Sequence, residues 1–360
     1  MSIEVLPWQR ATLTELLSRR ESLPHALLIY GKQGVGKVEF ARAVSQSLLC
    51  ESPDHGIACG TCPACGWFRE GNHPDFRELL PESLTEDEPE TKEDAPADAE
   101  SKEKKKSREI KVEQIRDIGG FMTLSTHRDG FRVLLVHPAE ALNANAANAL
   151  LKTLEEPPAR TVILLVTDRI GRLLATIKSR CQRLLVPAPD EETALQWLSA
   201  QGVNDGEVAL SQAGGAPMDA IAFADAQYQA DRKAFTQVLS DSNADYLAAA
   251  QMFEKRELAN ILDWLQTWIG DLALSRFTGQ VRHHRDQRAA ISRIATRVDL
   301  PALFRYESQL RQARRSVHHP LNARLLLEQL LISYSHAIRN RGRTNAPTRQ
   351  RAITFNDAAL

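Results

Sequence analysis

The chain has no long apolar run, little net charge and few cysteines, and each shortage argues against a class of protein. No uninterrupted hydrophobic stretch approaches the ~20 residues that a bilayer-spanning helix needs, so we expect no membrane segment. The N-terminus lacks the basic-then-apolar pattern of a secretory signal, which favours a cytoplasmic protein. The formal net charge of −1 argues against a protein that coats nucleic acid by bulk electrostatics.

The length and the overall composition of the chain are ordinary for a globular protein. With 360 residues, the chain is long enough for two or three domains with cores of their own. Its hydrophobic content of 43% and charged content of 25% are typical of a globular protein. There are five cysteines, and in a reducing compartment they indicate metal binding or catalysis rather than disulfides.

Four of these cysteines lie within sixteen positions. Their C-x8-C-x2-C-x2-C spacing lets four thiolates close a tetrahedral zinc shell. We therefore predict a structural zinc module over residues 50–65, stabilised by the metal in place of a core. The alternative is that the four cysteines are unrelated thiols. A zinc module of this type would not by itself reveal the function, because such modules bind nucleic acid, bind protein or only stabilise a local shape. The predicted ligands are Cys50, Cys59, Cys62 and Cys65.

A short apolar strand over residues 27–30 runs directly into the motif G-x4-G-K at residues 31–37. The backbone amides of such a loop cradle phosphates and its lysine reaches them, but Val38 replaces the Ser or Thr whose hydroxyl holds magnesium. Two interpretations stay open: passive phosphate binding, or a glycine-rich turn kept for the strand-to-helix connection. The candidate phosphate-binding residues are Gly31, Gly34, Gly36 and Lys37.

Residues 131–181 read as strand, helix, strand and helix, and the rest of the chain is organised around them. The runs 131–136 and 161–166 are continuously apolar, as in parallel strands buried on both faces. Between them, residues 143–154 repeat apolar side chains at helical spacing. Thr167 ends the second run, where open α/β sheets place ligand contacts, and it joins the candidate nucleotide-binding residues. We predict an α/β domain on a parallel sheet, followed by helices only.

Two segments differ in composition from the rest. Residues 82–100 carry nine acidic residues against one lysine, and residues 102–108 carry five basic ones. Because such a segment buries too little apolar surface to order itself, residues 82–109 are predicted to be a disordered insertion, with an acidic peptide for a partner as the alternative. Residues 339–351 hold five arginines and no acid, which indicates a solvated tail or a weak site for DNA or a partner.

The motifs together point to a family. The run from Asn148 to Pro158 (NALLKTLEEPP), followed after twenty residues by Ser179-Arg180-Cys181, resembles the AAA+ clamp-loader ATPases of bacterial DNA polymerase III. The order of P-loop strand, cysteine cluster and second strand is similar to theirs too. The likeness covers residues 1–220 by motif and the remainder by layout. It implies a RecA-like AAA+ domain over 1–187 that carries the zinc module, a helical lid over 188–235, a helical collar over 236–340 and a flexible tail over 341–360.

The departures from the family's ATPase members all concern catalysis. In those members the strand that corresponds to residues 133–136 ends in an Asp-Glu pair that orients magnesium and activates water, whereas here the pair is His137 and Pro138. Met218 stands where active members carry a lid arginine. With Val38 included, four catalytic positions hold residues that cannot perform the catalytic roles of their counterparts in the ATPase members. The resemblance therefore implies a member that does not hydrolyse ATP, although ATP or ADP binding stays open.

The tripeptide Ser179-Arg180-Cys181 is intact. In this family its arginine reaches across a subunit interface and stabilises charge on the phosphoryl group of ATP bound by the neighbour. An arginine suits this role because it is always ionised and presents a planar fork to phosphate oxygens. A lone arginine would by default be a surface ion pair, but this context favours the finger. Cys181 is then a buried neighbour rather than a fifth zinc ligand.

The resemblance thus implies a non-hydrolysing subunit of the DNA polymerase III holoenzyme, a DNA-directed DNA polymerase. The implied partners are the gamma/tau-type ATPase subunits, a delta-type subunit, the sliding clamp and primer–template DNA. Two alternatives stay open. An active ATPase motor of the same family requires a hydroxyl at position 38 and acids at positions 137 and 138. A zinc-containing DNA-binding module requires basic and aromatic residues around the cysteines, where Trp67, Phe68 and Arg69 offer little.

Overall fold

The computed structural model describes residues 5–85, 106–123, 130–316 and 322–339. Its contacts divide the chain into two compact units, residues 1–222 and 223–360, and the finer boundaries predicted at 187 and 235 remain predictions. None of the helices in the described ranges is both long and apolar enough to cross a membrane. Residues 86–105 of the predicted insertion and the whole predicted tail lie outside the described residues.

A five-stranded parallel sheet forms the centre of the first unit, in the order β2-β3-β4-β1-β5. Its inner strands are the apolar runs of the sequence: Leu134 on β3 pairs with Ile163 on β4, and Leu165 pairs with Leu28 on β1. These strands are buried on both faces, which explains why their sequences are continuously apolar. The strands are β1 (Ala26–Tyr30), β2 (Phe76–Leu79), β3 (Arg132–Val136), β4 (Thr161–Thr167) and β5 (Gln182–Leu185).

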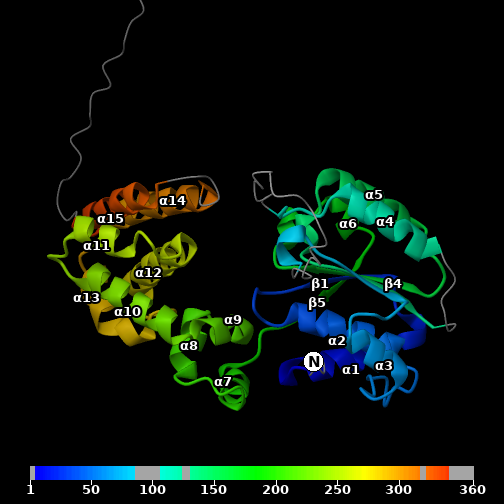
Figure 1. The fold of residues 1–360 in the computed structure, drawn as a ribbon. Helices are drawn as coiled ribbons and strands as arrows, with labels where there is room; N and C mark the ends of the chain where they lie inside the picture. Colours follow the sequence, from blue (N-terminus) through cyan, green and yellow to red (C-terminus); the bar gives the residue numbers. More distant parts are fainter. Residues whose placement is uncertain (1–4, 86–105, 124–129, 317–321, 340–360) are drawn as a thin grey trace, which may run out of the picture. The chain divides into compact units, whose positions relative to one another are not determined.

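Helices cover both faces of this sheet (Figure 1). On one face, Leu13 of α1 and Phe40 of α2 share a core with Leu27 of β1. On the other face, Leu150 of α5 packs in a core with Leu28, the next residue of β1, because successive side chains of a strand point to opposite faces. The helices of these layers are α1 (Arg10–Ser18), α2 (Lys37–Leu49), α3 (Pro63–Arg69), α4 (Val112–Thr123), α5 (Ala144–Glu155) and α6 (Ala175–Lys178).

Three helices follow the sheet within the first unit: α7 (Glu191–Ala200), α8 (Gly206–Gln212) and α9 (Pro217–Phe223), whose last residue opens the second unit. The carboxylate of Asp190 accepts a hydrogen bond from the amide of Thr193, which caps the start of α7. The rings of Trp197 on α7 and Trp8 in the N-terminal turn lie edge to face, with centroids 5.4 Å apart. This segment therefore packs onto the N-terminal part of the same unit.

The second unit is helical over its described residues, as predicted. Its core surrounds Trp268, whose indole N–H donates to the hydroxyl of Tyr334 at 2.9 Å. The expected core positions Trp264, Trp268 and Tyr306 are buried, but Phe304 is 50% exposed because it falls off the apolar face of its helix. The helices are α10 (Ala226–Ser240), α11 (Tyr246–Phe253), α12 (Leu258–Thr278), α13 (Arg288–Ala295), α14 (Leu300–Ser316) and α15 (Ala323–Arg339).

A buried polar network ties the second unit together. The guanidinium of Arg232 donates to both oxygens of Asp286, at 3.0 and 2.7 Å, and to Nδ1 of His284 at 2.9 Å. The other ring nitrogen of His284 lies 3.0 Å from the hydroxyl of Thr267, while Asp271 accepts from the backbone of the same turn. Burial, followed by the charge of Arg232, lowers the pKa of His284 to about 3. The network therefore requires a neutral imidazole.

The described ends of the 82–109 insertion lie side by side. The amide of Ser83 donates to the carbonyl of Ser107 at 2.9 Å, and the amide of Ser107 donates to Glu82 at 3.0 Å. The prediction placed residues 82–85 and 106–109 in a disordered segment, but these contacts hold the two stretches against each other.

Candidate functional site

The G-x4-G-K motif forms the connection between β1 and α2. Gly34 and Gly36 have φ angles of 73° and 83°, a region in which only glycine is unstrained. Lys37 begins α2 and is 4% exposed. The motif thus forms a loop that runs into a helix N-terminus, which is the geometry of a phosphate-binding loop.

The amino group of Lys37 is held by the chain itself. Its Nζ lies 2.5 Å from a carboxylate oxygen of Asp168, which directly follows β4, and 2.5 Å from the carbonyl of Lys32. The cation that would reach a phosphate is thus paired with an internal anion. Asp168 carries a role that its position in the sequence did not suggest.

A second carboxylate covers the loop. Asp219, on α9, packs so closely on Gly34 that a Cβ atom there would lie 2.4 Å from its Cγ. The amide of Met218 fixes this arrangement by donating to the carbonyl of Gly34 at 3.0 Å. Burial, followed by the charge of Asp168, raises the pKa of Asp219, although Lys37 and Lys32 act in the opposite direction.

The N-terminal turn packs against the loop as well. Gln9, which is buried, donates from its side-chain amide to the carbonyls of Val35 and Gly36 at 3.0 and 2.7 Å. The indole of Trp8 donates to the carbonyl of Val35 at 3.0 Å. The fit to a bound nucleotide is therefore partial: the backbone has the right path, but the lysine is paired and acidic side chains border the loop.

At the ends of β3 and β4, one position expected to lack a catalytic group, His137, and one candidate nucleotide-binding residue, Thr167, both contact acidic side chains. His137 follows β3 and places Nε2 2.7 Å from Glu78 of β2, which also pairs with Arg42. Burial alone would raise the pKa of Glu78, but these two partners lower it overall. Thr167, at the end of β4, donates its hydroxyl to Glu140 at 2.6 Å and is fully buried. His137 therefore faces a carboxylate, and the hydroxyl of Thr167 is engaged within the protein.

Arg180 lies just after α6, where the chain turns into β5. Its Nε donates to Oε1 of Glu155 at 2.8 Å, and Nη2 pairs with the same oxygen. Its Nη1 donates to the carbonyl of Thr176 at 3.0 Å, and Ser179 donates its hydroxyl to that carbonyl as well. The side chain of Arg180 is 34% exposed. The predicted finger is thus ordered and reaches the surface of the first unit.

The four predicted metal ligands come together. Their sulfur atoms all lie within 4.8 Å of one another, with 3.6 Å between Cys50 and Cys59 and 3.8 Å between Cys50 and Cys62. Neighbouring sulfurs in a tetrahedral shell with Zn–S bonds of about 2.3 Å are about 3.8 Å apart, so the cluster fits zinc. Cys50 ends α2, and Cys62 and Cys65 lie at the start of α3.

Hydrogen bonds to sulfur order the cysteine cluster further. The amides of Cys59 and Cys62 donate to the sulfurs of Cys50 and Cys59, each at 3.3 Å. The hydroxyl of Ser52, followed by the amides of Thr61 and Cys62, lowers the pKa of Cys59 to about 5. Cys181 is outside the cluster, and burial raises its pKa to about 11.

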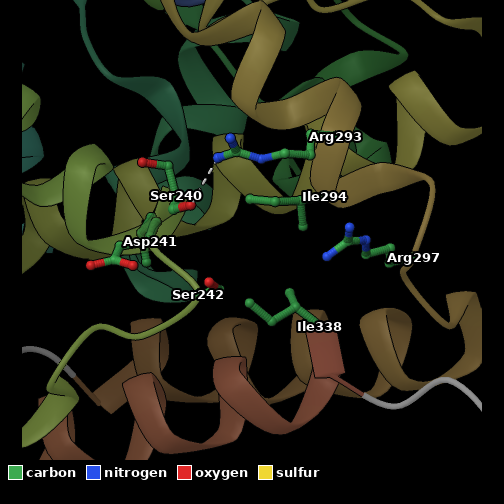
Figure 2. Close-up of a pocket in the computed structure, with 8 residues that line it drawn as sticks. Ser240, Asp241, Ser242, Arg293, Ile294, Arg297 and Ile338 are labelled. Atoms are coloured by element: carbon green, nitrogen blue, oxygen red, sulfur yellow. Dashed lines mark hydrogen bonds between the residues drawn. The ribbon is translucent and has the colours of Figure 1, made fainter.

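One cavity of about 660 Å³ lies in the second unit, between α10, α13 and α15 (Figure 2). Arg293 of α13 donates to the carbonyl of Ser240 at 3.3 Å across its rim, and Ile294 and Ile338 supply apolar wall. Asp241, Ser242 and Arg297 supply the polar part of its lining.

The sheet order, the loop between β1 and α2 and the helices on both faces define a P-loop domain of the AAA+ class. The family model described as "DNA polymerase III, delta subunit" matches residues 9–190, and the model described as "DNA polymerase III, delta subunit, C terminal" matches residues 226–336. The chain belongs to the delta′ subunit family of the bacterial DNA polymerase III clamp loader.

Curated relatives agree with this assignment. The "DNA polymerase III subunit delta'" of Pseudomonas aeruginosa is 32% identical over 92% of this chain and 98% of its own length. The protein of the same name from Escherichia coli is 29% identical over 92% and 95%. The "DNA polymerase III subunit tau" of Salmonella typhimurium is 31% identical over 53% of this chain and 28% of its own length. Among solved structures, a gamma subunit-related protein from Thermotoga maritima aligns with a TM-score of 0.43 at 18% identity, covering 91% of this chain and all of that one.

Proposed function

We propose that this chain is a non-hydrolysing clamp-loader subunit that donates Arg180 to the ATP site of a neighbouring ATPase subunit. The observation that carries the proposal is a contrast within one domain. The guanidinium of Arg180 is ordered and reaches the surface, whereas Lys37 of the chain's own loop is paired with Asp168 and the acidic pair is replaced by His137 and Pro138. Such a domain would supply a guanidinium to the ATP site of another subunit and would not hydrolyse ATP itself.

Arg180 suits this work because its charge is permanent and its donors lie in one plane. A phosphoryl group in transfer spreads negative charge over its outer oxygens, and an arginine supplied by another subunit stabilises that charge. Fingers of this kind are worth about 10³ to 10⁵ in rate. Ser179 would hold the backbone turn that presents the side chain, since its hydroxyl closes onto the carbonyl of Thr176.

The glycine-rich loop then serves mainly as a connection. Gly31, Gly34, Gly36 and Lys37 retain the path of a phosphate loop, and Thr167 lies at the end of the neighbouring strand. With no hydroxyl at Val38 to hold magnesium, ATP or ADP bound here would be held weakly and left intact.

We infer that the cysteine cluster holds one structural Zn²⁺. Cys50, Cys59, Cys62 and Cys65 supply four sulfurs at tetrahedral spacing, with no position left for water. The metal would join the end of α2 to the start of α3 in a segment that has few apolar side chains of its own. Its role is to fix shape rather than to take part in chemistry.

We propose that residues 236–340, which lie within the second unit, form the collar through which the subunits associate. Six of its large apolar side chains within the described ranges are more than 40% exposed, and these are the positions that we expect a neighbouring subunit to cover. They are Leu247, Met252, Phe277, Phe304, Leu325 and Ile332. The proposed partners are gamma/tau-type ATPase subunits and a delta-type subunit, and the assembly would load the sliding clamp on primer–template DNA in the cytoplasm.

ATP turnover tests the proposal directly. We expect none from the isolated chain, and a large loss of turnover when Arg180→Ala replaces the wild-type chain in an assembly with the ATPase subunits that still forms. Robust turnover by the isolated chain would overturn the proposal and support an active ATPase. An assembly indifferent to Arg180→Ala would leave the chain a scaffold or a DNA-binding part.

A further inference from the structure

We propose that Glu155 is a positioning residue for Arg180. Its carboxylate binds the Nε and Nη2 side of the guanidinium, so that the terminal nitrogens point toward a phosphate bound by the neighbouring subunit. The inference rests on the proposed function, because it concerns the same arginine. It adds a residue that acts through the finger without touching ATP.

The contacts of Arg180 come from two elements. Oε1 of Glu155, the last residue of α5, receives both Nε, at 2.8 Å, and Nη2. The carbonyl of Thr176 in α6 receives Nη1 at 3.0 Å. The guanidinium is thus held in one plane and one orientation by anchors on either side of it.

The donors that remain are those a phosphate would use. Arginine has five N–H donors, of which Glu155 takes two and Thr176 takes one. One hydrogen is left on each terminal nitrogen, and the one on Nη1 makes only a long contact of 3.4 Å with the hydroxyl of Ser179. A phosphate that took the place of the Ser179 hydroxyl would receive one hydrogen from each terminal nitrogen.

The place of Glu155 in its helix is itself unfavourable. An anion at a helix C-terminus opposes the negative end of the helix dipole, so a carboxylate there needs another partner. Arg180 is that partner. Because both side chains are substantially exposed, at 50% for Glu155 and 34% for Arg180, their pairing contributes little to folding stability. Its effect is to order a flexible arginine before the neighbouring subunit arrives.

Glu156 provides a matched control. It is the next residue along, it is also acidic and exposed, and within the described ranges it makes no ion pair. A general effect of removing negative charge from this corner would therefore appear in Glu156→Ala as well as in Glu155→Ala.

The experiment measures steady-state ATP turnover by the full-length chain assembled with ATPase subunits from the same organism. Wild type is compared with Glu155→Ala, Glu155→Gln, Glu156→Ala and Arg180→Ala. We expect Glu155→Ala to lower kcat roughly 3- to 10-fold, well short of the loss in Arg180→Ala, because misplacement weakens the finger without deleting it. KM for ATP, the concentration needed for assembly and the Tm should not change. Glu155→Gln should recover part of the rate because its amide oxygen still accepts, and Glu156→Ala should match wild type.

Each other outcome overturns something specific. Wild-type turnover in Glu155→Ala beside a deficient Arg180→Ala would remove Glu155 from the mechanism and leave the proposed function standing. Faster turnover in Glu155→Ala would mean that the carboxylate masks the finger, which is the opposite of positioning. Wild-type turnover in Arg180→Ala would overturn the proposed function and this inference together.

Discussion

At the scale of single residues, two acids hold the glycine-rich loop in place. Asp168 takes the amino group of Lys37, and Asp219 lies against Gly34. Each is adjacent to a residue picked out from the sequence, Thr167 in one case and Met218 in the other. Their function shows only in three dimensions, because each acts on a loop more than a hundred residues away in the chain.

The substitution Asp219→Asn tests whether the charge of Asp219 destabilises the folded protein. Burial and Asp168 raise the pKa of Asp219, so between the ordinary value of 3.8 and the raised pKa the folded state binds more protons than the unfolded state. The free energy of unfolding therefore falls as pH rises through that window. We expect Asp219→Asn to match or exceed the wild-type Tm at pH 7, with the difference closing toward pH 4. The measurement is thermal unfolding across that range.

The exposed Glu207→Gln provides the control, with no change in the pH profile expected. A lower Tm for Asp219→Asn at pH 7 would mean that the attraction of Lys37 and Lys32 outweighs burial, contrary to this reading.

At the scale of elements, predictability follows the range of the interactions. β3 and β4 were predictable because strands buried on both faces have continuously apolar sequences. α5 was predictable because its buried face repeats apolar residues at helical spacing. The cysteine cluster was predictable because its spacing is local. β2 was missed because Arg77 and Glu78 interrupt its apolar pattern at the sheet edge. The pairing of Glu155 with Arg180 was missed because nothing local joins the end of α5 to the end of α6.

The module at residues 50–65 gives an element-scale prediction. Cys62→Ser should lose the zinc that we expect at one ion per wild-type chain, because three sulfurs no longer close the shell. Structural zinc contributes several kcal/mol, and 1 kcal/mol shifts the Tm of a unit of 150–250 residues by about 2–4 °C, so the Tm should fall by roughly 5–10 °C. Metal analysis and thermal unfolding measure the two effects.

Cys181→Ser is the matched substitution, since Cys181 is buried outside the cluster. It should keep the full zinc content. A wild-type chain purified without zinc, or a Cys62→Ser chain that retains it, would contradict the assignment.

At the scale of the whole molecule, the two units carry separate cores and should respond differently to acid. His284 has its pKa lowered to about 3, so the stabilisation that depends on its neutral form is present above pH 6.5 and is lost as pH falls toward 3. Asp286 shares this direction: burial would raise its pKa, but Arg232 lowers it overall. Both groups belong to residues 223–360.

From pH 6.5 to pH 5 the imidazole of His284 gains a proton in the unfolded state but stays neutral in the folded state. This difference should cost the second unit about 1.6 kcal/mol, because the slope approaches 1.36 kcal/mol per pH unit only below the unfolded pKa. Hydrogen exchange corrected for intrinsic rates should show α10 and α12 losing protection, while β1, β3 and β4 keep theirs. His284→Gln should flatten this response, and the exposed His336→Gln should not. Equal loss in both units would show that acid acts through other groups.

The edge-to-face contact between Trp8 and Trp197 has a practical consequence. One indole is bonded to the glycine-rich loop and the other belongs to α7, so the pair joins the loop to the helices that cover it. Two aromatic chromophores at this distance and angle couple optically. A nucleotide that entered the loop and separated the two rings would therefore change the tryptophan emission and the circular dichroism of the native protein.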